Sequence, residues 1–103
     1  MTISYPILAV RQENGLYQIR FPDFPEPDMP MPEFFDLSGA MDYAKVYISA
    51  MLRSLQKTGE PFPRPSSIQE LDFGEDHPVA VYILIFPEDL KEDTYWKETI
   101  SQS

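Results

Sequence analysis

The stretch that decides the fold runs from Leu37 to Lys57 and reads LSGAMDYAKVYISAMLRSLQK. Its main apolar residues recur at alternating intervals of four and three, which keeps them on one side of an α-helix. They are Leu37, Met41, Ala44, Ile48, Met51 and Leu55. Asp36 stands at the N-cap position, and Gly59 followed by Pro61 ends the helix. We therefore predict one long amphipathic helix that covers one face of a sheet.

A second, smaller stripe of the same helix contains Ala40, Tyr43, Tyr47 and Ala50. It is either the margin of a broad buried face, which is the favoured interpretation, or a surface that meets another subunit. The second interpretation makes Tyr43, Tyr47 and Ala50 candidates for an oligomer interface. Trp96 joins them, because tryptophan is enriched at interfaces, although covering the open end of the core is the slightly favoured role for it.

Length and composition set the broad class. A chain of 103 residues is expected to form one domain, with a core at about residues 3–87 and an acidic tail or short helix at 88–103. The absence of cysteine excludes disulfides and thiolate chemistry. The N-terminus has no signal-peptide pattern, and the longest apolar run, Val79 to Phe86, is far too short for a bilayer span. We therefore predict a cytoplasmic protein.

The charge pattern favours a basic partner over nucleic acid. The net charge is −9, and the segment from Pro22 to Asp36 contains five acidic residues and no basic one. Affinity for nucleic acid comes largely from Lys and Arg that neutralise phosphates, so direct binding of nucleic acid is not expected. A basic protein would instead be attracted and steered to this chain. The alternative, in which the acidity serves only solubility, is about equally favoured.

Three segments are predicted to form strands before the helix and one after it. Tyr5–Gln12 and Leu16–Phe21 flank an Asn-Gly pair, which is a strong signal for a hairpin. The proline-rich segment that follows is predicted to end in an edge strand near Phe35. Val79–Phe86 is apolar throughout, which is typical of an inner strand with both faces covered.

These elements predict an α+β fold of the β-β-β-α-β kind, with a mixed sheet and one long helix packed on one face. The crossing from the third strand through the helix to the fourth is expected to be right-handed. The length of the helix then lets the last strand lie beside the first and parallel to it.

Several short motifs, taken in order, resemble the family of HicB-type antitoxins. They are Tyr5-Pro6, Gly15-x-Tyr17, Phe21-Pro22-Asp23-Phe24-Pro25, Leu37…Ala40…Ala44, and Gly59-Glu60-Pro61-Phe62-Pro63 followed by Pro65-Ser66. The resemblance implies a partial, degenerate RNase H-like fold. It also implies a protein that commonly oligomerises and that neutralises a small basic mRNA-cleaving toxin, HicA, by covering its active surface. The family's C-terminal DNA-binding segment is not expected here, because only 17 residues follow Phe86 and the charged ones among them are mostly acidic.

The predicted partner-binding residues lie in the acidic, proline-stiffened loop before the helix. They are Asp23, Phe24, Glu26, Asp28, Met29 and Met31. No catalytic residue, metal ligand or cofactor is predicted. The lone His77 is interpreted as an exposed loop residue, because no nucleophile motif accompanies it.

Two other functions are kept open. One is a solitary, self-associating structural or regulatory module without a toxin, derived from a phage or mobile element. The less favoured one is a metal-dependent nuclease, which would use Asp23, Glu26 and Asp28 to hold divalent cations.

Overall fold

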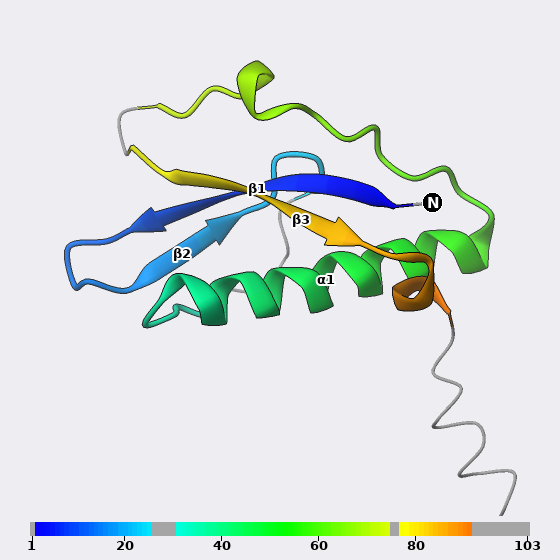
Figure 1. Cartoon of the computed structure of the whole chain (residues 1–103), viewed down its shortest axis with the longest axis horizontal. Helices are drawn as coiled ribbons and strands as arrows, with labels where there is room; N and C mark the ends of the chain where they lie inside the picture. The colour runs from blue at the N-terminus through cyan, green and yellow to red at the C-terminus, as the bar shows by residue number, and fades with distance from the viewer. Residues whose placement is uncertain (1, 26–30, 75–76, 92–103) are drawn as a thin grey trace, which may run out of the picture.

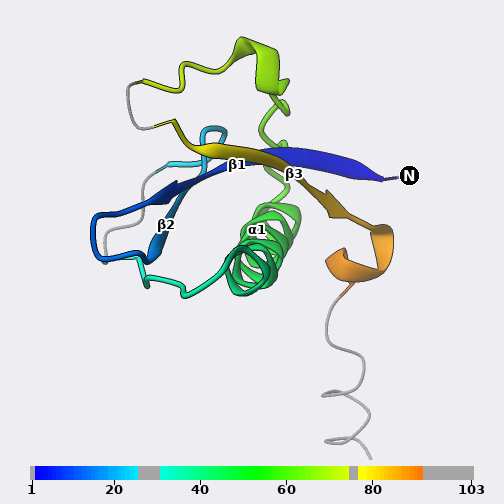
Figure 2. The same ribbon diagram turned by 60° about the vertical axis from the view of Figure 1, so that its left-hand side comes forward.

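A three-stranded antiparallel sheet with one long helix makes up the described part of this computed structural model, residues 2–25, 31–74 and 77–91. The elements are β1 (Ile3–Arg11), β2 (Tyr17–Arg20), α1 (Leu37–Thr58), the 3₁₀ turn η1 (Ile68–Glu70), β3 (Val79–Ile85) and the 3₁₀ turn η2 (Pro87–Leu90). Helix α1 covers one face of the sheet, and residues 59–74, here called the connector, run back along the opposite side (Figures 1 and 2). The predicted α+β class and single long helix are confirmed.

The hairpin of β1 and β2 forms around Asn14 and Gly15, as predicted. Gly15 has a φ of 85°, a conformation that glycine adopts without a steric penalty. The amide of Gln12 donates to the carbonyl of Leu16 at 2.8 Å, and the side chain of Asn14 accepts from the Leu16 amide at 2.9 Å. The turn thereby sets the register in which Leu8 lies opposite Arg20.

The edge strand predicted near Phe35 is reduced to a single bridge in the described residues. Phe34 and Tyr17 exchange two backbone hydrogen bonds, at 2.7 and 2.9 Å, and no longer strand is formed there. The prolines in this segment lack the donors that a longer ladder requires.

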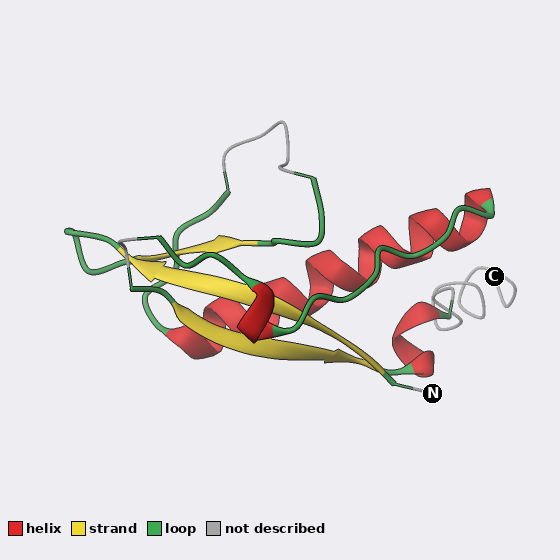
Figure 3. Cartoon of the chain, turned by 90° about the horizontal axis from the view of Figure 1, so that it is seen from above, coloured by secondary structure: helices red, strands yellow, loops and turns green. Residues whose placement is uncertain are grey.

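The last strand is correctly placed beside the first, but its predicted direction and inner position are wrong. β3 pairs antiparallel with β1, with Ile3 opposite Ile85 and Ala9 opposite Val79. The strand order β2-β1-β3 puts β3 at an edge of the sheet (Figure 3). The physical reason is the path of the chain. Helix α1 runs the length of the sheet and the connector runs back again, so β3 starts at the end of the sheet where β1 finishes.

Helix α1 begins and ends where its caps indicate. The carboxylate of Asp36 accepts from the Gly39 amide at 2.8 Å, and Gly59 closes the C-terminal end with a φ of 74°. The buried face is rotated from the predicted stripe: Ala40, Ala44, Ile48, Ser49 and Leu52 are buried. Met41 is 37% exposed, so its predicted place in the core is wrong. Small alanines at 40 and 44 let the helix lie close to the sheet, which leaves Met41 on a flank.

The part of the C-terminal region that the structure describes ends at Lys91. Pro87–Leu90 form the short η2 turn, and the rest of the predicted tail, including Trp96, lies outside the described residues. None of the helices in the described ranges combines the length and hydrophobicity that crossing a membrane requires.

Candidate functional site

The turn that follows β2, residues Phe21 to Pro25, is fixed by the burial of Phe24. The Phe24 amide donates to the Phe21 carbonyl at 3.1 Å, which closes the turn. The Phe24 ring packs against Tyr5 of β1, with 4.8 Å between ring centroids, and is only 7% exposed. Aromatic pairs at such distances add to the stabilisation that burial provides. The turn is therefore anchored to the core of the sheet.

Asp23 ties the same turn to the connector. Its two carboxylate oxygens accept from the Ser66 amide at 2.9 Å and from the Ser66 hydroxyl at 2.5 Å, across 43 residues of sequence. The two motifs Phe21-Pro22-Asp23 and Pro65-Ser66, quoted above for the resemblance, are therefore in direct contact. The sequence indicated Ser66 through its motif but did not indicate that it would bond to Asp23.

Tyr5 adds a second link between β1 and the connector. Its buried hydroxyl donates to the carbonyl of Pro63 at 2.7 Å. Burial, and secondarily the negative charge of Asp23, raise the pKa of Tyr5 from 10.0 to about 12. Both causes disfavour the phenolate, so the hydroxyl remains a donor at neutral pH.

This raised pKa predicts a loss of stability in alkali. Between pH 10 and 12 the unfolded chain releases the Tyr5 proton while the folded chain keeps it, so the free energy of unfolding should fall as pH rises. The slope from this group should reach at most about 1.4 kcal/mol per pH unit. Urea titrations between pH 8 and 12 measure it, and Tyr5→Phe should flatten the slope. An unchanged slope in that variant would assign the effect to other groups.

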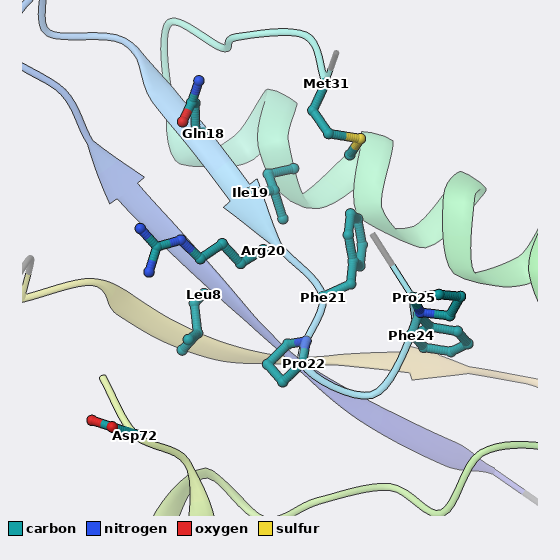
Figure 4. Close-up of a pocket in the computed structure, with 10 residues that line it drawn as sticks. All are labelled: Leu8, Gln18, Ile19, Arg20, Phe21, Pro22, Phe24, Pro25, Met31 and Asp72. Carbon is teal, nitrogen blue, oxygen red and sulfur yellow. The ribbon is translucent and has the colours of Figure 1, made fainter. Parts of the chain in front are cut away.

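A pocket of about 560 Å³ opens beside this turn, on the side of β2 (Figure 4). Its exposed lining is polar and apolar in about equal parts, and Gln18, Arg20 and Asp72 supply the polar side chains. The apolar part consists of Leu8, Ile19, Phe21, Pro22, Phe24, Pro25 and Met31. Concave sites of this size can hold a side chain of a partner or a small ligand. In the described residues, no three His, Cys, Asp or Glu side chains are placed to hold a metal ion.

The structure places three of the six predicted partner-binding residues. Asp23 is half-buried and bonded to Ser66, Phe24 is in the core, and Met31 is half-buried at the pocket. The other three, Glu26, Asp28 and Met29, lie outside the described residues. Asp23 and Phe24 thus have structural roles that the sequence did not indicate.

The tyrosines of the second stripe pack within the chain. Tyr43 contacts Phe34 at 5.2 Å between centroids, and Tyr47 stacks on Phe21 at 4.5 Å. Both are half-buried, as the margin of a broad buried face should be, whereas Ala50 is exposed. Their role at an oligomer interface remains a prediction.

Sequence periodicity also missed a polar cluster at Asp89, which joins the end of β3 to α1. Its carboxylate lies 3.6 Å from the Lys45 ammonium and accepts from the Phe86 amide at 2.9 Å. Its carbonyl accepts from the Arg53 guanidinium at 2.8 Å, and Lys45 also lies over the Phe86 ring. No local sequence pattern predicts such contacts, because they join residues from distant parts of the chain.

Comparison with solved structures shows where this fold occurs elsewhere. A chain of a toxin–antitoxin complex from Streptococcus pneumoniae matches with a TM-score of 0.70 and 16% sequence identity. The match covers 99% of this chain and 88% of that chain. At this identity the likeness shows a shared fold. Neither a model of a known protein family nor a curated protein sequence matches the chain.

Proposed function

We propose that this chain is the non-enzymatic, antitoxin component of a toxin–antitoxin pair of the HicB type. It would neutralise a small, basic, mRNA-cleaving toxin of the HicA type by covering its active surface. The observation that carries the proposal is the fold match along nearly the whole chain to a member of a toxin–antitoxin complex. A net charge of −9 supports it, because opposite charge accelerates and orients the encounter of two proteins.

We expect the negative charges that contact the toxin to come from the acidic segment between Pro25 and Met31. Glu26 and Asp28 are the acids in that loop whose side chains we assign to the partner. Asp23 is removed from the contact set, because its carboxylate holds Ser66. The pocket lined by Phe21, Pro25 and Met31 offers apolar side chains for contact with a side chain of the toxin.

Co-expression with the small basic protein encoded next to this chain's gene tests the proposal. That protein alone should arrest growth, and this chain should restore growth and co-purify with it. Glu26→Lys with Asp28→Lys should abolish both effects. Glu13→Lys with Asp42→Lys changes the net charge equally at two exposed positions outside the loop, and should preserve both effects.

Three results would count against the proposal. A basic neighbour that is not toxic, or whose toxicity this chain does not relieve, would remove the antitoxin role. Equal rescue by both double variants would retain that role but remove the acidic loop from the interface.

A further inference from the structure

β3 forms one edge of the sheet in the described residues. In the described part of the chain, β3 pairs with β1 on one side and with no strand on the other. The amide of Gln12, just after β1, donates to the carbonyl of Leu16, just before β2. Because backbone groups alternate in direction along a strand, the even-numbered residues of β1 direct their N–H and C=O groups toward β2. The odd-numbered residues of β1 direct theirs toward β3. The register with β1 pairs odd with odd residues. Ala80, Tyr82 and Leu84 therefore turn their N–H and C=O groups to the open edge.

The same edge carries most of the large apolar side chains that are exposed in the described residues. Val79, Tyr82, Leu84 and Phe86 are each 40–50% exposed. On α1, Met41 lies on the same flank as Lys45, and Lys45 contacts Asp89 just after β3. Tyr43 and Tyr47 lie on the other flank, toward Phe34 and Phe21. Long apolar edges with unpaired backbone groups are sites where another chain pairs.

We infer that two copies of this chain pair antiparallel through β3 and form a continuous six-stranded sheet. A two-fold axis at Tyr82 places Val79 opposite Ile85 of the second copy, and Ala80 opposite Leu84. In this register the outward N–H and C=O groups of β3 in one copy lie opposite the outward groups of β3 in the other copy. Side chains on the helix side of one strand also lie opposite side chains on the helix side of the other. Such an isologous contact closes on itself as a dimer. Both copies of α1 then lie on the same face, where the exposed flank with Met41 is covered.

The charge pattern favours a second copy over a basic partner at this edge. No charged residue occurs from Val79 to Phe86, although the chain has a net charge of −9. A basic protein would find no carboxylate on the strand, whereas two paired copies of this uncharged strand add no charge repulsion of their own. The dimer is independent of the proposed antitoxin role.

Sedimentation velocity over a concentration series of the full chain tests the dimer. The mass should rise from 11.9 kDa toward twice that value. Leu84→Pro removes an outward donor without removing a bond to β1, and should weaken dimerisation at least about tenfold. Leu84→Ala is the matched control, because it shortens the same exposed side chain but keeps the N–H donor. It should weaken dimerisation less.

Amide exchange of Ala80, Tyr82 and Leu84 identifies what covers the edge. Exchange that slows as concentration rises supports the dimer. A chain that stays at 11.9 kDa up to millimolar concentration overturns it. If the amides of that monomer are nevertheless protected, another part of the same chain covers the edge. Dimerisation that Leu84→Pro leaves unchanged, with the variant folded by circular dichroism, would move the interface elsewhere.

Discussion

Replacing Leu52 with alanine is expected to lower the free energy of unfolding by about 2–5 kcal/mol. Leu52 is fully buried, in the cluster where α1 meets the sheet. The loss has two parts, because the removed methyl groups no longer leave water on folding and a cavity remains where the helix cannot collapse onto the strands. Urea unfolding followed by circular dichroism measures the change. A domain of this size has only about 5–15 kcal/mol of stability, so the variant should be close to unfolding.

Val46→Ala is the matched control on the same helix. Val46 is 67% exposed, so its truncation should change the free energy of unfolding by no more than about 0.5 kcal/mol. Similar losses in the two variants would show that α1 does not present the Leu52 side to the sheet.

Asp23→Ala is expected to destabilise the chain by about 1.5–3 kcal/mol, because it removes two hydrogen bonds to a carboxylate and leaves the Ser66 donors without their acceptor. The site is half-buried, so water can replace part of the lost interaction and the lower end of the range is favoured. Chemical denaturation of the purified variant gives the value. The consequence for function is direct: a partner that needs Asp23 would compete with the contact that holds the connector.

A double-mutant cycle with Ser66→Ala isolates the hydrogen bond from the Ser66 hydroxyl, because alanine keeps the backbone amide that also donates to Asp23. The losses in unfolding free energy of the two single variants should add up to more than the loss of the double variant. The difference is the interaction energy, expected to be about 0.5–3 kcal/mol. Additive losses would mean that the two side chains do not interact in solution. Asn14→Ala serves as a comparison for the size of these losses, because it removes exposed hydrogen bonds to Leu16 and Glu33 that do not involve the connector.

These contacts also explain why only part of the candidate site could be predicted. The acidic composition of residues 22–36 indicated a contact surface for a basic partner, and that prediction still applies to Glu26 and Asp28. Composition does not indicate which acid of a loop becomes a structural acceptor. Asp23 has that role because Ser66 reaches it, and this depends on the path of the connector. Phe24 is in the core for a related reason, since Tyr5 presents a ring against it.

The sequence by itself determined the elements whose causes are local. Asn14-Gly15 specifies the hairpin, and Asp36 with Gly59 specifies the ends of α1, because each acts through neighbouring backbone groups. Only the tertiary structure decided that β3 is an antiparallel edge strand, that Asp23 holds Ser66 and that Asp89 joins Lys45. These features depend on how the connector returns along the sheet, and contacts between residues far apart in the chain leave no periodic trace in the sequence.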